Sequence, residues 1–392
     1  MQLSRRLIAL GATTAIILAA CSGTAATTAP TTAPSTAPSM APSVAPSMAP
    51  SMAPSMAPSA SASAGADYSS WKACVAFDTG GLGDKGFNDL AKKGLDEAAA
   101  LGFKVAQSEA KGSSDYAANI QRLIDQGCNS IITVGFNQAQ ATVDAVKANA
   151  DIAFGQVDTT WDTTNNGPIP PNFTGLDFQI DQAAMLAGYL AAGWSKTGKM
   201  GTYGGQQFPG VTRFMDGYYA GIAYYNKEKG TTVSLLGWNG ATQKGTFVGG
   251  DNPWGDAAKG EQLAKTFVDQ GADIVGPVAG STGNGSIKYM KTKNLWAIGV
   301  DTDQSLSLPD YAPAILTSAQ KVIDAAVLDT FKANAAGTTG GANYVGTMEN
   351  GGVALAPFHA FDSQISSDLK AGIAALQAKL VDGSVKVSDY LK

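Results

Sequence analysis

Beyond residue 72, short apolar runs alternate with longer segments in which apolar residues recur every three or four positions. The short runs are typical of buried strands in a parallel sheet, and the longer segments are typical of amphipathic helices packed on it. The predicted strands are 73–77, 103–107, 130–134, 152–157, 172–178, 199–203, 233–236, 273–277, 295–300, 314–318 and 353–356. The predicted helices are 87–101, 115–126, 138–149, 179–194, 211–227, 257–270, 286–293, 319–335 and 366–380.

The order of these segments predicts an α/β fold. Repeated strand–helix–strand units form parallel sheets with right-handed crossovers. The rhythm restarts at residue 199, and the roughly 325 residues beyond residue 66 suit two similar lobes better than one core.

The first 66 residues follow neither pattern. Two arginines precede an apolar stretch, which predicts a secretory signal peptide over 1–20 that is too short to remain as a membrane span. It ends in Leu-Ala-Ala-Cys, which resembles a bacterial lipobox, so lipidation of Cys21 is expected; the alternative is a spare cysteine beside an ordinary cleavage site. The segment 21–66 is rich in Ala, Pro, Ser, Thr and Met and has no aromatic or charged residue, which is typical of an extended spacer. The signal peptide is compatible with export by either the Sec or the twin-arginine route.

The charge balance argues against several classes of partner. The chain has 27 Lys and Arg against 32 Asp and Glu, a formal net charge of −5, and no basic cluster. Nucleic-acid binding is therefore not expected, and contact with a membrane would come from the lipid anchor only. With one histidine, His359, and no clustered thiols, neither a metal site nor another cofactor is expected.

Two cysteines remain after Cys21. Cys74 and Cys128 each stand near the start of a predicted strand, and export permits a disulfide. The sequence leaves two alternatives open, a Cys74–Cys128 bridge or two buried thiols.

Carboxylates follow three of the predicted strands, as Asp78, Asp158 and Asp301. Because ligands bind beyond the carboxyl ends of parallel strands, we expect these side chains to face one another across a cleft between the lobes. Carboxylates accept strong hydrogen bonds from hydroxyl groups, and a set with few basic partners suits a neutral polyol such as a sugar or ribose rather than a phosphate. The alternative is that each aspartate caps the helix that follows it.

Two aromatic residues lie in loops that lead into predicted helices. Phe87, followed by Asn88, ends a Gly-rich loop, and Trp254 is at the tip of the loop 251–256. Facing each other across the cleft, the two rings would sandwich a flat ligand ring. The alternatives are an ordinary Gly-rich turn at the first loop and, at the second, a tryptophan that covers a helix start.

A Gly-rich stretch, 278–286, separates a predicted strand from a predicted helix. It is not a phosphate-binding P-loop, because Ser286 stands where that motif needs lysine. We expect its glycines, Gly280 among them, to allow close approach of an uncharged ligand. Lys321, in the helix predicted after the strand 314–318, is a cation near the strand ends. His359 has no clear partners for a catalytic triad, so no enzyme activity is expected.

These motifs resemble those of the basic membrane protein family of lipoproteins, which are substrate-binding components of ABC transporters for purine nucleosides. The first motif is Asp-Thr-Gly-Gly at 78–81 with Asp-Lys-Gly-Phe-Asn at 84–88. The stretch 271–304 is similar to the second-lobe signature, and Ile-Leu-Thr-Ser-Ala-Gln-Lys at 315–321 is similar to the segment that supplies a lysine. The likeness spans 71–358 in the right order.

The resemblance implies a two-lobed periplasmic-binding-protein fold of the ribose-binding type, with parallel sheets flanked by helices and three inter-lobe crossovers. The lobes would be 67–178 plus 302–345, and 179–301 plus 346–392. The implied partners are a nucleoside and a transporter permease, and we expect the chain to be a monomer. The implied contacts are stacking on the base by Phe87 and Trp254, ribose binding by Asp301 and Lys321, and base-edge contacts from Asp78, Asn88 and Asp158.

Two departures from the family pattern bear on the ligand. Gly86 replaces the usual serine, and Trp254 stands where phenylalanine is typical, in a longer loop, 247–254. The alternatives are a sugar or other small-polyol receptor, serving an importer or a sensor, and, from a different class, an α/β hydrolase or nucleoside-cleaving enzyme. The aromatic pair favours the nucleoside.

Overall fold

The computed structural model describes residues 66–338 and 340–392. Cys21, the predicted signal peptide 1–20 and all but the last residue of the predicted linker 21–66 lie outside the described residues. In the part of the chain that is described, no helix is both long enough and apolar enough to cross a membrane.

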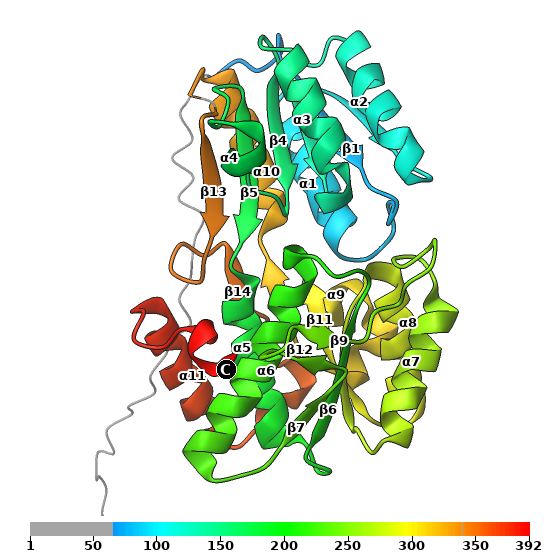
Figure 1. Cartoon of the computed structure of the whole chain (residues 1–392), viewed down its shortest axis with the longest axis vertical. Helices are drawn as coiled ribbons and strands as arrows, with labels where there is room; N and C mark the ends of the chain where they lie inside the picture. Colours follow the sequence, from blue (N-terminus) through cyan, green and yellow to red (C-terminus); the bar gives the residue numbers. More distant parts are fainter. Residues whose placement is uncertain (1–65, 339) are drawn as a thin grey trace, which may run out of the picture. The chain divides into compact units, whose positions relative to one another are not determined.

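The first lobe, at the top of Figure 1, is built on a six-stranded parallel sheet. In spatial order its strands are β13 (Ala342–Gly346), β5 (Phe173–Phe178), β4 (Ala153–Val157), β3 (Ser130–Val134), β1 (Lys72–Phe77) and β2 (Lys104–Glu109). Its helices are α1 (Phe87–Ala100), α2 (Tyr116–Asp125), α3 (Ala139–Ala148), α4 (Thr163–Asn166) and α10 (Ile323–Ala335), with the short 3-10 turns η1 (Ser113–Asp115) and η2 (Phe136–Gln138).

Both faces of this sheet are buried, which is why its central strands are continuous apolar runs. Along β1, Val75 and Phe77 belong to the same apolar cluster as Leu95 of α1. Cys74 and Ala76, on the other face, cluster with Leu123 of α2.

The second lobe repeats this design. Its six-stranded sheet has the order β14 (Val353–Leu355), β12 (Ile315–Lys321), β11 (Trp296–Asp301), β10 (Ile274–Val278), β6 (Lys199–Gly204) and β7 (Ser234–Leu236). Only β14 is antiparallel among these strands. The helices are α5 (Ile180–Trp194), α6 (Pro209–Lys229), α7 (Ala257–Asp269), α8 (Gly280–Thr292), α9 (Gln304–Ser307) and α11 (Ser367–Val381). Smaller elements are the two-stranded sheet β8 (Trp238–Asn239) and β9 (Lys244–Gly245) and the 3-10 turns η3 (Pro309–Ala314), η4 (His359–Gln364) and η5 (Val387–Tyr390).

The chain crosses between the lobes after β5, after β12 and after β13. The predicted return to the first lobe at residue 302 is wrong, because β12 pairs with β11 in the second sheet. The return occurs after Lys321, which the sequence placed in a helix and which is the last residue of β12. The edge strand β13 was not predicted, since its half-exposed residues carry no clear apolar pattern.

Helices α5 and α6 pack closely through glycines on α6. A Cβ atom at Gly221 would lie 2.1 Å from the carbonyl oxygen of Met185, and one at Gly217 would lie 2.5 Å from that of Asp181. Any larger residue would push the two helices apart. This contact places the first turn of α6 at the cleft.

The Gly-rich stretch 278–286 is helical from Gly280 onward, as the first turns of α8, and not a loop. A Cβ atom at Gly285 would lie 1.9 Å from the carbonyl oxygen of Ala257, and one at Gly260 would lie 1.8 Å from that of Thr282. These glycines therefore let α7 and α8 approach each other. Tertiary packing outweighs their low helix propensity. The expectation that the glycines allow close approach of a ligand is therefore wrong for Gly285, whereas Gly280 lines the cavity described below.

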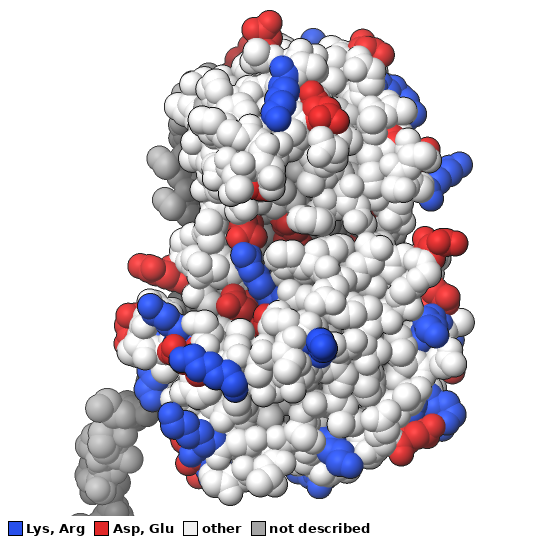
Figure 2. Space-filling view, in the orientation of Figure 1, with Lys and Arg blue, Asp and Glu red and all other residues white. Residues whose placement is uncertain are grey.

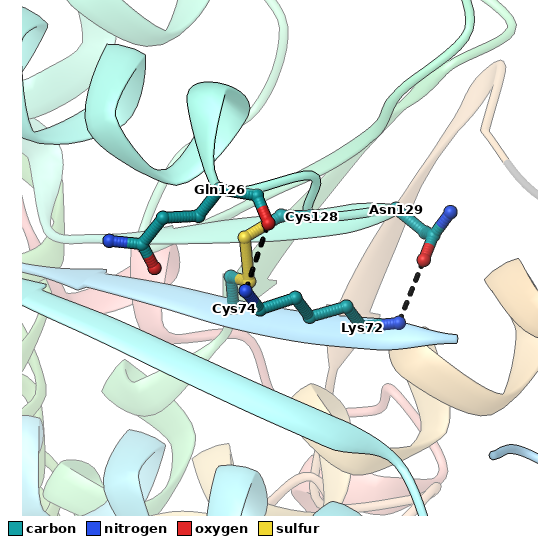
Figure 3. The surroundings of a disulfide bond; sticks show 5 residues. All are labelled: Lys72, Cys74, Gln126, Cys128 and Asn129. Carbon is teal, nitrogen blue, oxygen red and sulfur yellow. Dashed lines mark hydrogen bonds between the residues drawn. A yellow bond between two sulfur atoms is a disulfide. The ribbon is translucent and has the colours of Figure 1, made fainter. Parts of the chain in front are cut away.

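Cys74 and Cys128 form a disulfide in the structure (Figure 3). It ties β1 to the turn before β3, and the two cysteines are separated by 54 positions in the sequence. Beside the bridge, the Nζ atom of Lys72 donates to the carbonyl oxygen of Gln126 at 2.9 Å, and the Lys72 backbone N–H donates to Oδ1 of Asn129 at 2.8 Å. The neighbouring strands β1 and β3 are thus linked covalently and by hydrogen bonds at their amino ends.

Candidate ligand-binding cleft

A cavity lies between the two lobes, where the carboxyl ends of their strands meet. Figure 2 shows acidic side chains along the boundary between the lobes on the face drawn. The cavity is lined by every residue that the sequence suggested as a ligand contact: Asp78, Phe87, Asn88, Asp158, Trp254, Gly280, Asp301 and Lys321. The topology therefore brings these residues to one place, although they are spread over more than 240 positions in the sequence.

Asp158 and Asp301 occupy corresponding places in the two lobes. Asp158 follows β4, and Asp301 ends β11, which has the same position in the second sheet. Both have left-handed backbone, with φ of 60° and 65°. This conformation costs roughly 1–2 kcal/mol for a residue with a Cβ atom, and such strain clusters at functional sites. Neither caps the following helix, since Asp162 and Asp303 are the N-caps of α4 and α9.

Lys321 holds these two aspartates together. Its Nζ atom lies 2.6 Å from Oδ2 of Asp158 and 3.7 Å from Oδ1 of Asp301. The ammonium group also lies over the rings of Phe87 and Phe214, 5.3 and 5.0 Å from their centroids. Its side chain is only 2% exposed, so the ammonium group has exchanged water for two carboxylates and two aromatic faces.

Asn88 joins two further carboxylates at the start of α1. Its Nδ2 atom donates to Oδ1 of Asp78 at 3.1 Å and to Oδ2 of Asp84 at 3.0 Å. Asp84 also accepts from the backbone N–H groups of Gly86 and Asn88, at 2.9 and 2.8 Å, and so fixes the turn that leads into the helix. Both amide protons of Asn88 are used, which leaves its Oδ1 atom as a buried acceptor without a protein partner among the described residues.

Burial shifts the acidity of all four carboxyl groups. It raises the pKa of Asp301 to about 7, against the opposing effect of Lys321, and raises the pKa of Asp78 to about 6. The pKa values of Asp158 and Asp84 are also raised, again chiefly because burial disfavours the charged form. The cavity therefore contains four carboxyl groups that are costly to ionise and would gain from ligand groups that donate hydrogen bonds.

Aromatic rings line the remaining walls. The centroid of Phe208 lies 5.7 Å from that of Trp254 and 5.1 Å from that of Phe136. The backbone of Trp254 is held by its carbonyl oxygen, which accepts from the N–H of Thr282 in α8 at 3.1 Å. Its Nε1 atom is buried and has no partner among the described residues.

Several lining residues were not identified from the sequence: Asp84, Phe136, Phe208 and Phe214. Asp84 had a usable signal, because an aspartate in a turn commonly accepts from the backbone N–H two residues later, as Asp84 does from Gly86. The three phenylalanines had none, since a single aromatic near a predicted helix start is usually a core residue.

Comparison with known proteins identifies the family. Residues 72–384 match the family model Bmp, described as ABC transporter substrate-binding protein PnrA-like. The chain belongs to this family. It is therefore an ABC transporter substrate-binding protein, as the resemblance implied.

Relatives in the family span most of the chain. The ABC transporter nucleoside-binding protein BmpA of Lactococcus lactis is 29% identical over 339 residues, which cover 81% of this chain and 88% of that protein. Basic membrane protein A of Borreliella burgdorferi is 30% identical over 258 residues, which cover 65% of this chain and 69% of that protein. An uncharacterized lipoprotein of Pyrococcus horikoshii is 30% identical over 72% of this chain and 68% of its own.

A crystal structure of ABC transporter solute-binding proteins from Aeropyrum pernix has the same fold. It superposes with a TM-score of 0.71 at 24% identity and covers 81% of this chain and 92% of that one. The two-lobed fold predicted from the sequence is confirmed.

Proposed function

We propose that this protein captures a purine nucleoside between its lobes and delivers it to an ABC importer. The observation that carries this proposal is that two polar clusters and several aromatic rings line one cavity. In the first cluster, here called the first end, Lys321 pairs with Asp158 and Asp301. In the second cluster, the second end, Asn88 donates a hydrogen bond to Asp78. A polyol at one end and a flat, polar-edged ring at the other is the chemistry of a nucleoside. The name of the Lactococcus lactis relative agrees with it.

At the first end, ribose hydroxyls would donate to Asp301 and accept from Lys321. Hydrogen bonds to charged groups contribute roughly 1.5–3 kcal/mol each. Asp158 belongs to this end, because its Oδ2 atom accepts a hydrogen bond from the Nζ atom of Lys321. That placement differs from the base-edge role that the resemblance implied for Asp158.

The base would stack between Trp254 and Phe87, whose ring also faces Lys321. Its edge would meet Asp78 and Asn88 at the second end. The free Oδ1 acceptor of Asn88 favours a base edge that donates a hydrogen bond, such as an exocyclic amino group or a ring N–H. Asp78, with its pKa raised to about 6 by burial, is able to accept a hydrogen bond or, when protonated, to donate one. This pair would discriminate between bases by their edges.

Phosphorylated nucleosides would be excluded. Four carboxyl groups line the cavity, and among the described residues that line it Lys321 is the one cation, already held by two of them. Two unit charges 4 Å apart interact by about 4 kcal/mol at an effective dielectric constant of 20. A phosphate group would meet this repulsion without a second arginine or lysine among the described lining residues to offset it.

A sugar or other small-polyol receptor is the second candidate, and the carboxylate–lysine cluster alone would serve it. A binding panel separates the two: adenosine, guanosine, inosine, the free bases, ribose and adenosine monophosphate, measured by thermal shift and calorimetry. A bound ligand raises the apparent stability by RT ln(1 + [L]/Kd). The proposal expects nucleosides to rank above ribose and above the monophosphate. Equal shifts with ribose and nucleosides would favour the sugar receptor.

We further propose that the protein works outside the cytoplasm, anchored by a lipid on Cys21, with the segment up to residue 66 as a spacer. The sequence supports this through the signal peptide, lipobox and proline-rich linker. The name of the Pyrococcus horikoshii relative is consistent with it.

A further inference from the structure

Two phenylalanines stack across the cleft. Phe136 lies in η2 of the first lobe and Phe208 immediately precedes α6 in the second lobe. Their ring centroids are 5.1 Å apart with an interplanar angle of 19°. Beside them, the Nδ2 atom of Asn137 donates to Oε1 of Gln206 at 3.1 Å. Neighbouring residues of each lobe thus make an aromatic and a polar contact with the other lobe.

This pair is at the mouth of the cavity. Both rings line it, and Phe136 is 40% exposed, whereas the other described lining residues are buried or half-buried. The mouth is at the proposed base end, because a Cβ atom at the preceding residue, Gly135, would lie 2.7 Å from Oδ2 of Asp78. On the side of the cavity, Phe208 also contacts the ring of Trp254.

Each ring is mounted on a fixed support. The η2 turn is held by the buried side chain of Gln138, whose Nε2 atom donates to the carbonyl oxygens of Ala76 and Val134 at 2.9 and 2.8 Å. On the other side, Pro209 starts α6, and the carbonyl oxygen of Phe208 accepts from the N–H of Val211 at 2.9 Å. The backbone that carries each ring is therefore fixed within its own lobe, so the rings separate when the lobes move apart.

We propose that Phe136 and Phe208 form an aromatic gate that closes the cavity over the bound ligand and sets its rate of release. The proposal rests on the proposed function, because it concerns the fate of the bound nucleoside. The two rings contact each other only when the lobes are closed, so their stacking stabilises the closed state and not the open one. Losing it accelerates opening and release, while capture by the open form keeps its rate.

The test is stopped-flow binding of inosine, guanosine and adenosine to the purified full-length protein and to Phe136→Ala, Phe208→Ala and the double variant. Each single variant is expected to raise koff by about 2- to 12-fold, the range that corresponds to the stacking energy of an aromatic pair. The kon values should stay within about 2-fold of wild type. The double variant should raise koff by less than the product of the single effects, because either change alone already removes the stack.

Two control variants separate the gate from a general loss of structure. Phe136→Tyr keeps the ring and should raise koff much less than Phe136→Ala does. Leu101→Ala truncates another exposed apolar side chain of the first lobe, 46% exposed and outside the cavity, and should change neither rate.

The outcomes distinguish the gate from the function it rests on. If no nucleoside binds the wild-type protein, the proposed function is wrong, and the gate proposal, which rests on it, is wrong as well. If nucleosides bind and both alanine variants release them at the wild-type rate, or if the two effects multiply, the gate alone is overturned. An equal rise of koff in Leu101→Ala would also overturn it.

Discussion

Asp158 and Asp301 come from opposite lobes, share a left-handed backbone, and both approach the ammonium group of Lys321, at 2.6 and 3.7 Å. One cation between two carboxylates neutralises only part of their charge, and the raised pKa values of both aspartates reflect their burial. Lys321 therefore links the two lobes by its ion pairs, and a ligand hydroxyl that donates to Asp301 would stabilise the negative charge that Lys321 leaves uncompensated.

The affinity for nucleosides is expected to rise with pH between about 5 and 8. Without ligand, the pKa of Asp301 is raised to about 7 because the carboxyl group is buried; Lys321 opposes the shift, and Asp158 and Asp84 add to it. Ribose hydroxyls that donate to the ionised carboxylate would lower this pKa, so binding below pH 7 releases a proton. Calorimetry of inosine binding in two buffers of different ionisation enthalpy measures the proton directly. Asp301→Asn should remove the dependence around pH 7; a variant with an unchanged pH profile would contradict the assignment.

The stability of the unliganded protein should show the opposite trend. Folding raises the pKa of Asp301 from 3.8 to about 7, so the folded protein holds this proton more tightly than the unfolded chain does. The contribution to stability is fully present below pH 3.8 and is lost as the pH rises through about 7. Thermal unfolding between pH 5 and 8 should therefore show decreasing stability, and Asp301→Asn should flatten the decrease. Asp181, whose pKa burial raises to about 6, contributes in the same direction, so Asp181→Asn is the matched comparison outside the cavity. If only Asp181→Asn changed the slope, Asp301 would not be the source.

Much of the fold follows from the sequence because buried parallel strands are nearly continuous apolar runs. That pattern placed β1, β4 and β11 and the aspartates at their ends. The same reasoning failed at α8, where glycines serve helix packing that local propensity cannot express. It also failed at Lys321, since the strand β12 continues through polar residues that only its neighbours explain.

The residues that line the candidate site were easier to predict than the contacts that they make with one another. Asp78 and Asp301 were visible as strand-end carboxylates, whereas the pairing of Asp158 with Lys321 depends on how the lobes meet. Phe136 and Phe208 touch across the cleft although they lie 72 positions apart in the sequence. Contacts between lobes carry no local periodicity, so a pattern along the chain cannot reveal them.

The disulfide is expected to contribute substantially to stability. Cys74 and Cys128 are 54 positions apart, and constraining a loop of that length in the unfolded chain corresponds to about 4 kcal/mol in the chain-entropy treatment. Replacing both cysteines by alanine, or adding reductant, should lower the midpoint of thermal unfolding. Intact-mass analysis after alkylation, with and without reductant, checks the bridge itself. Two free thiols in native protein would contradict it.

Membrane anchoring is expected to depend on Cys21. Cys21→Ala should abolish incorporation of radiolabelled palmitate and release the protein from the membrane fraction. Nucleoside binding should be unchanged, because every residue that lines the cavity lies between Asp78 and Lys321. Undiminished labelling of the variant would exclude Cys21 as the lipidated residue.

Trp254 and Asp301 should affect nucleoside and ribose binding differently, and this comparison separates the two candidate functions. Asp301→Ala removes a carboxylate that would accept from ribose, so it should weaken binding of inosine and free ribose alike, by roughly 1.5–3 kcal/mol for each hydrogen bond lost. Trp254→Ala should cost inosine about 1–3 kcal/mol, the contribution of one stacked base. Free ribose, which has no flat ring, should be nearly unaffected. Trp71→Ala, in a half-buried tryptophan outside the cavity, is the matched control for loss of an indole ring. If Trp254→Ala left inosine affinity intact while Asp301→Ala weakened both ligands equally, the base would not stack on Trp254, and the sugar receptor would explain the site better.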